Sequence, residues 1–272
     1  MRRQAPRPKY QPAWYPSPIS LPERTIGKFS VQHRTVMEKT PVIGMRQAYT
    51  RGLRPVTAKL SEPLHIHELV EKGHGLWMTD LPEELNQIGE MLYHVQPQDK
   101  VLVGGLGLGI VATTVSRLPQ VTETVVVEKS KAVIKLCGPE NYAEETYLTA
   151  HADILQFLQD FPKPFDYYLL DTWCGNNELT WWGTVLPLRR TIRQHWGVVP
   201  VVHCWAEDIM WGQVKRRLCN LTKKDAHWYY APEFCGMSEP EAEQFQQDAG
   251  LKDWEKRYGP ILDRVVKKMS GR

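Results

Sequence analysis

From residue 100 onward, short apolar runs alternate with segments whose apolar positions follow helical spacing. Runs without polar alternation are typical of strands buried on both faces, and alternation of strands with helices indicates a parallel sheet covered by helices. The expected strands are 101–103, 124–127, 146–150, 165–170 and 198–202, and the expected helices are 110–117, 131–137, 154–159, 186–195 and 208–218. The pattern predicts an α/β domain over residues 95–238.

The chain before this domain has a different pattern. Turn-forming residues separate strand-like segments, and a helix with one apolar face follows them. The expected strands are 25–36, 42–49, 64–69 and 75–78, and the expected helix is 81–93. We therefore predict a small β-rich appendage with a linking helix over residues 24–94.

The two ends of the chain are polar. Residues 1–23 are rich in proline and basic side chains, which predicts an extended or disordered arm. A solvated tail is the simpler interpretation, and contact with a partner subunit or a phosphate backbone is the alternative. An edge strand is expected at 227–230 and a charged helical tail at 239–272. An oligomer formed through the N-terminal region is compatible with this arrangement.

Composition narrows the class of protein. The 272 residues carry a net charge of +3, with 42% apolar and 24% charged residues, as in ordinary globular proteins. This charge neither requires nor excludes a nucleic-acid partner. We find neither an apolar run long enough for a membrane span nor the apolar core of a signal peptide. The five cysteines include no C-x-x-C pair, so we expect a cytoplasmic protein without a disulfide framework or zinc site.

A cluster of glycines follows the first strand of the α/β domain. Gly104, Gly105, Gly107 and Gly109 stand between that strand and the next helix. Glycine adopts positive φ without steric cost and lets the backbone approach a ligand, and the N–H groups of the following helix point at the same place. The cluster predicts a nucleotide-binding turn, although such turns also serve tight strand–helix packing.

Acidic residues follow the next three strands. Glu128 ends the second strand, where a carboxylate is placed to accept hydrogen bonds from a ribose diol. Asp153 follows the third strand, as a helix cap or as an acceptor for an adenine amino group. Asp171 follows the fourth strand at the same carboxyl edge. The predicted cofactor-binding residues are Gly104, Gly105, Leu106, Gly107, Gly109, Glu128, Lys129, Ala152, Asp153 and Asp171.

This order of features resembles class I S-adenosylmethionine (SAM)-dependent methyltransferases over residues 95–205. The resemblance implies a Rossmann-like, seven-stranded, mostly parallel sheet with SAM as the cofactor. Within that superfamily, the stretch 75–83, the helix after it, His94 and residues 101–105 are similar to the domain junction of spermidine synthases. Those enzymes also carry an N-terminal β domain.

Three positions depart from the spermidine synthase pattern. The acidic residue that the family places inside the glycine turn corresponds to Leu106, and its second aspartate after the fourth strand corresponds to Cys174. The glutamine that the family uses near its cofactor corresponds to Trp77. The nucleotide half of the pattern is therefore present and the amine half is not.

We predict a SAM-dependent methyltransferase that acts on an N or O acceptor of unknown identity, with Asp171 as the catalytic residue that orients the acceptor or takes its proton. The alternatives are an aminopropyltransferase that uses decarboxylated SAM and a non-catalytic assembly module. The G-x-G-x-x-A spacing from Gly107 also fits a dinucleotide-binding oxidoreductase, a weaker interpretation. The expected substrate-pocket residues are Trp77, Gln87, Trp173 and Cys174.

Metal binding is a minor alternative. His65 and His67 alternate on an expected strand and could share one face, but no further ligand can be named. We therefore expect no metal site.

Overall fold

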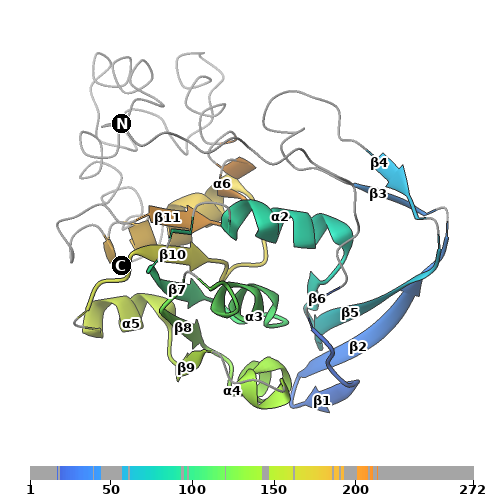
Figure 1. Ribbon diagram of the computed structural model, residues 1–272, viewed down its shortest axis with the longest axis horizontal. Helices are drawn as coiled ribbons and strands as arrows, with labels where there is room; N and C mark the ends of the chain where they lie inside the picture. Colours follow the sequence, from blue (N-terminus) through green and yellow to red (C-terminus); the bar gives the residue numbers. More distant parts are fainter. Residues whose placement is uncertain are drawn as a thin grey trace. The chain divides into compact units, whose positions relative to one another are not determined.

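The computed structural model shows an α/β sheet and a β-rich N-terminal part (Figure 1). It describes residues 17, 19–38, 40–43, 57–60, 62–92, 95–96, 98–119, 121–142, 147–161, 163–185, 187–189, 191–192, 201–207, 209–210 and 213. The chain divides into two compact units, 1–157 with 165–170 and 158–164 with 171–272.

Four parallel strands of the first unit belong to its α/β sheet. They are β7 (Lys100–Gly104), β8 (Glu123–Glu128), β9 (Leu148–His151) and β10 (Tyr167–Leu170), in the order β10-β7-β8-β9. The register pairs Gly104 with Leu170 on one side and with Val127 on the other, so the carboxyl ends of the three strands meet at one edge. Residues 101–104 and 167–170 are buried, which explains their uninterrupted apolar pattern. These four strands confirm the sequence prediction.

Three helices of the α/β part begin where the sequence predicts them. They are α3 (Ile110–Ser116), α4 (Lys131–Cys137) and α5 (Ile154–Asp160). Ser130 caps α4, because its hydroxyl oxygen accepts a hydrogen bond from the Val133 N–H at 3.3 Å. A short 3-10 turn, η1 (Pro139–Asn141), follows α4. The helix α3 contacts β7 and β8, and α4 contacts β8 and β9.

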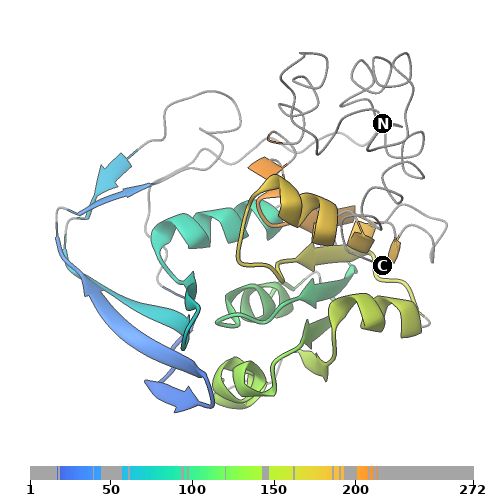
Figure 2. The ribbon, with the colours of Figure 1, turned by 180° about the vertical axis from the view of Figure 1, so that it is seen from behind.

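An antiparallel sheet precedes the α/β part, with strand order β1-β2-β5-β6. Its strands are β1 (Arg24–Ile26), β2 (Phe29–Val36), β5 (Leu64–Glu71) and β6 (Gly75–Thr79). The single strand expected over 25–36 is wrong, because Gly27 at φ 61° allows a tight turn that folds β2 back on β1. Figures 1 and 2 show α4 beside β1 and β2, which it contacts.

Two further elements complete this part of the first unit. A two-stranded ribbon pairs β3 (Pro41–Ile43) with β4 (Thr57–Lys59), and β4 was not predicted. The expected strand 42–49 is described only to residue 43. The linking helix α2 (Pro82–Leu92) begins with proline at its first position, as predicted. The Tyr167 hydroxyl donates a hydrogen bond to the Met91 carbonyl at 2.9 Å, which joins α2 to β10.

The buried carboxylate of Asp80 orients His67, which in turn holds the segment before the antiparallel sheet. Asp80 is 2% exposed, and its oxygens accept from the backbone N–H of His67 at 2.6 Å and from its ring Nδ1 at 2.7 Å. The other ring nitrogen of His67 accepts from the Leu21 N–H at 3.4 Å, and His33 Nε2 donates to the Leu21 carbonyl at 2.7 Å. Both contacts of His67 together require the neutral ring with its proton on Nδ1. These hydrogen bonds hold the backbone of Leu21 against β2, which carries His33, and β5, which carries His67.

The second unit contains α6 (Glu178–Thr180), the π-helical turn η2 (Trp181–Val185) and β11 (Val201–Cys204). The sequence did not predict α6 or η2. Residues 187–189 and 191–192 are helical, within the expected helix 186–195, and so are residues 209, 210 and 213 of the expected helix 208–218. Arg189 forms a bidentate ion pair with Glu207 and donates to the Val202 carbonyl at 3.0 Å.

Several expectations lie outside the described residues, including the arm up to residue 16, the strand 227–230 and the tail 239–272. Within the described part, the α/β region has five strands, β7 to β11, where seven were expected. Among the described residues, no helix has both the length and the apolar character needed to cross a bilayer. The domain boundaries expected at 24, 95 and 239 stay predictions.

Candidate functional site

The glycine cluster forms a turn with three left-handed residues. Gly105, Gly107 and Gly109 have φ angles of 89°, 53° and 79°, a region that side chains strongly disfavour. The Gly105 N–H donates to the Val127 carbonyl at 2.9 Å, which holds the start of the turn against β8. Leu106 is 2% exposed, so its side chain packs into the protein. The alternation of glycines is therefore required by the backbone itself.

Close packing explains two of the glycines without a ligand. A Cβ on Gly104 would lie 2.8 Å from Leu170, and one on Gly109 would lie 2.7 Å from the Tyr142 hydroxyl and 2.9 Å from the Cys137 carbonyl. The Tyr142 hydroxyl donates to the Leu108 carbonyl at 2.8 Å. Burial raises the pKa of Tyr142, so the neutral hydroxyl remains the donor. This part of the turn serves strand–helix packing, the alternative that the sequence left open.

We expect Gly109→Ala to lower the free energy of unfolding by about 1–2 kcal/mol, because the left-handed conformation penalises a Cβ and the nearby Cys137 carbonyl cannot move easily. Urea unfolding measures the change. Gly89→Ala is the matched control, since Gly89 lies in α2 with no atom near its Cβ position. Alanine there should stabilise the helix by up to about 1 kcal/mol. Equal stability of Gly109→Ala and the wild type would contradict the expectation.

The carboxylate of Glu128 points at the glycine turn. Glu128 Oε2 accepts a hydrogen bond from the Leu106 N–H at 3.0 Å, and Oε1 accepts from the Ser130 N–H at 2.7 Å. The side chain is half-buried at the end of β8. Each carboxylate oxygen has two acceptor positions, so both retain capacity for another donor. The structure thus places an acidic group with free acceptor capacity directly beside the turn.

The residues after β9 have local roles. The Ala152 N–H donates to the Glu128 carbonyl at 3.2 Å. Asp153 caps α5 by accepting from the Leu155 N–H at 3.0 Å, and it accepts from Lys129 Nζ at 3.0 Å in an exposed ion pair. Burial raises the pKa of Asp153, but the hydrogen bonds from Lys129 and from the start of α5 outweigh it and lower the pKa. Asp153 is therefore ionised at neutral pH, and the capping role predicted for it is confirmed.

A residue of the antiparallel sheet also reaches the turn. A Cβ on Gly107 would lie 2.5 Å from Met78 Sδ, and the Leu108 N–H lies 3.4 Å from the same sulfur. Sequence reasoning missed Met78 and named its neighbour Trp77, whose indole N–H donates to Glu71 at 2.6 Å. Trp77 remains a predicted pocket residue.

A β-bulge explains why Met78 faces the turn. In the register of β6 with β5, Met78 pairs with Leu69 and Leu76 pairs with Val70, so Trp77 is an extra residue. Because Leu69 and Val70 point to opposite faces, Met78 and Leu76 do so as well. Leu76 is 54% exposed, whereas Met78 is half-buried. Simple alternation would have placed both residues on one face.

The remaining predicted site residues lie in α2 and directly after β10. Gln87 lies in α2. Asp171 is half-buried and follows directly on the last residue of β10, at the start of the second unit's main segment. Trp173 is 8% exposed, its indole nitrogen is buried without a partner in the described part of the chain, and Cys174 is an exposed free thiol. Their roles stay predictions.

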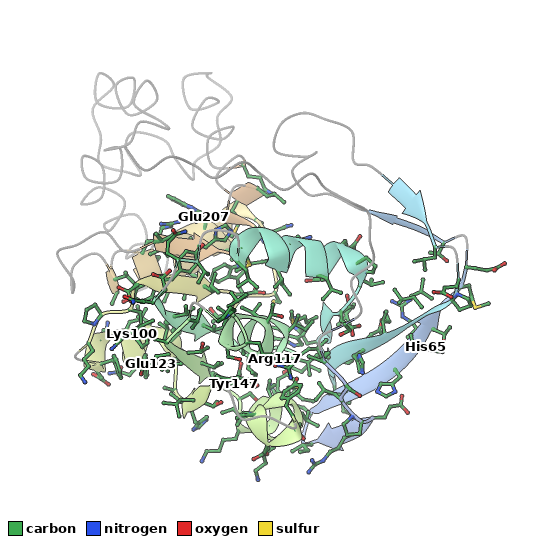
Figure 3. All side chains as sticks on the ribbon, viewed as in Figure 1. His65, Lys100, Arg117, Glu123, Tyr147 and Glu207 are labelled. Atoms are coloured by element: carbon green, nitrogen blue, oxygen red, sulfur yellow. The ribbon has the colours of Figure 1, made fainter. Side chains whose placement is uncertain are left out.

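The histidines considered as metal ligands have other partners. His65 Nδ1 lies 2.9 Å from the Thr35 hydroxyl, and His67 is held by Asp80 and Leu21. Among the described residues, no three histidine, cysteine, aspartate or glutamate side chains gather in a way that could hold a metal ion. Figure 3 shows His65 on the antiparallel sheet, with Lys100 and Glu123 together on neighbouring strands of the parallel sheet.

No protein-family model and no curated protein matches the sequence. Similar solved structures include precorrin 8W decarboxylase from Methanobacterium thermoautotrophicum, with 14% identity, a TM-score of 0.32, and coverage of 42% of this chain and 57% of that one. TrmN from Thermus thermophilus has 17% identity, a TM-score of 0.34, and coverage of 40% and 33%. The N-methyltransferase NodS from Bradyrhizobium japonicum has 14% identity, a TM-score of 0.31, and coverage of 40% and 58%. Each match spans less than two thirds of the solved chain, and similarity at this level assigns no activity.

Proposed function

We propose that the protein is a SAM-dependent methyltransferase of the class I type, acting on a nitrogen or oxygen acceptor. One observation supports this most: the Glu128 carboxylate accepts the Leu106 N–H of the glycine turn. A carboxylate held there can accept hydrogen bonds from the two hydroxyls of a ribose. The donor's ribose would therefore lie between the end of β8 and the turn.

The residues around Glu128 fit an adenosine group. Glu128 already binds two backbone N–H groups, which orient its carboxylate and leave acceptor positions for a diol. Ala152 and Asp153 follow the neighbouring strand β9, at the same edge of the sheet. We assign them to the adenine end of the donor, where the ionised Asp153 can accept from an amino group.

For methyl transfer, the protein mainly has to align the donor with the acceptor. SAM, when bound, supplies an activated methyl group on its sulfonium. The chain's own residues then have to hold the donor and orient the lone pair of the acceptor. We assign acceptor orientation or proton removal to Asp171, which directly follows β10.

The first test is donor binding by calorimetry, with SAM, S-adenosylhomocysteine and decarboxylated SAM as ligands. We expect binding of SAM and S-adenosylhomocysteine. Preference for decarboxylated SAM, together with spermidine formation from putrescine, would favour aminopropyl transfer instead. A folded protein that binds none of the three would be a non-catalytic module.

The second test concerns Asp171. We expect Asp171→Asn to lower methyl transfer by about 10²-fold or more, because general-base or orienting groups contribute at this level. Its affinity for S-adenosylhomocysteine should stay close to that of the wild type. Transfer is measured as S-adenosylhomocysteine release in a screen of amine, hydroxyl and carboxylate acceptors. Unchanged turnover would remove Asp171 from the catalytic role.

A further inference from the structure

The sulfur of Met78 occupies the space that Gly107 leaves open. The distance of 2.5 Å from Met78 Sδ to the Cβ position of Gly107 means that the thioether lies where a side chain would begin. The Leu108 N–H, two peptide units beyond the one that binds Glu128, lies 3.4 Å from the same sulfur. The side chain of Met78 therefore covers the turn at Gly107 and at the Leu108 N–H, where a ligand could otherwise approach the backbone.

The turn has two distinct ends. At one end the Leu106 N–H binds the strong acceptor Glu128, and at the other the Leu108 N–H has the weak acceptor Met78. A donor with its ribose on Glu128 would extend its other end along the turn toward Leu108. For SAM, that other end is the amino-acid tail.

Resting on the proposed function, we propose that the Met78 thioether is a displaceable plug that occupies the place of the donor's amino-acid tail in the nucleotide-free protein. The donor site would thus include a residue of the antiparallel sheet. A tail-bearing donor has to move Met78 off Gly107 and Leu108, whereas the nucleoside part alone does not.

Three properties make the plug displaceable. A thioether is a weak hydrogen-bond acceptor, so a carboxylate can replace it at the Leu108 N–H. Methionine is unbranched and has three rotatable bonds, so its end can move without moving β6. The side chain is half-buried and not fully enclosed by the protein. The apparent dissociation constant is then the intrinsic constant divided by the fraction of molecules in which the plug is open, so a mostly closed plug weakens binding.

The experiment compares S-adenosylhomocysteine and adenosine as ligands of the wild type and Met78→Ala, by calorimetry on the full chain. We expect Met78→Ala to bind S-adenosylhomocysteine on the order of threefold to tenfold more tightly, with unchanged affinity for adenosine. Met78→Leu keeps the bulk and should not gain affinity. Met37→Ala is the matched control, because Met37 is 62% exposed and directly follows β2, away in sequence from the turn.

Several outcomes would overturn the plug. Equal or weaker binding of S-adenosylhomocysteine by Met78→Ala would do so, and so would an equal gain for adenosine. An unchanged amide resonance of Leu108 in nucleotide-free Met78→Ala would refute the contact itself, whatever the protein binds. If no variant binds either ligand, the proposed function fails as well, whereas wild-type binding without the Met78 effect overturns the plug alone.

Discussion

Glu128→Gln is expected to weaken binding of S-adenosylhomocysteine by about 10- to 100-fold, because hydrogen bonds to a charged acceptor contribute about 1.5–3 kcal/mol. The loss has two sources. A neutral amide accepts more weakly from the ribose hydroxyls. Its NH₂ group also has to face either the Leu106 N–H or the Ser130 N–H, both of which are donors.

Glu123→Gln is the matched control for this prediction. Glu123 begins the same strand β8 and lies at its other end, where it pairs with Lys100 at 3.5 Å in an exposed ion pair (Figure 3). Its replacement should change neither affinity nor stability appreciably, since exposed pairs contribute about 0–1 kcal/mol. Calorimetry on both variants, with circular dichroism to verify folding, separates the outcomes. Equal affinity of Glu128→Gln and the wild type would remove the carboxylate from the donor site.

Asp80→Ala is expected to lower the free energy of unfolding by about 3 kcal/mol, the largest stability effect that we predict, since each unpaired buried donor costs about 1–3 kcal/mol. Its removal leaves the His67 N–H and the His67 ring without their acceptor. Residues next to Leu21 should loosen with it, because His67 also accepts from the Leu21 N–H.

Urea unfolding of Asp80→Ala against the wild type measures this change, with Glu62→Ala as the control because Glu62 is exposed in the same part of the chain. Glu62→Ala should stay within about 0.5 kcal/mol of the wild type. If Asp80→Ala also stayed within about 0.5 kcal/mol of the wild type, the hydrogen bonds of Asp80 would contribute little to stability.

The pH dependence of stability gives a second measurement on Asp80. Burial raises the pKa of this carboxyl, but hydrogen bonds from His67 and Ser17 outweigh burial and lower the pKa. The folded state thus favours the carboxylate, and its contribution is present above the unfolded pKa of about 3.9. This contribution is lost as pH falls from there through the lower folded pKa. Asp80→Ala should lack this part of the acid destabilisation, so the stabilities of the two proteins should converge below about pH 4.

Local signals in the sequence were enough for the strands β7 to β10 and the helices α3 to α5. Apolar runs without alternation identified β7, β8 and β10, and apolar positions at helical spacing identified α4 from Lys131 to Cys137. Each of these signals depends on a few consecutive residues. A strand that is buried on both faces is apolar on both, so the sequence does not have to show which face points to the core. The placement of Glu128 beside the turn also followed, because β7 and β8 are parallel neighbours whose carboxyl ends coincide.

Long-range contacts decided the rest. Neither the pairing of β4 with β3 nor the chain reversal at Gly27 follows from alternation of polar and apolar residues. The bulge at Trp77 changed which residue meets the glycine turn, since one extra residue in β6 reverses the side to which the following side chains point. A period-2 pattern contains no information about such an insertion.

By itself, then, the sequence determined the parallel strands, the glycine turn and the carboxylate beside it, because each depends on the burial or conformation of a few consecutive residues. Only the tertiary structure showed that Met78 covers Gly107 and that Asp80 and His67 hold the segment at Leu21. Met78 and Gly107 are 29 residues apart in the sequence, and Leu21 and His67 are 46 residues apart. Both contacts form only in the observed register of the antiparallel sheet, and this register results from the pairing of all its strands.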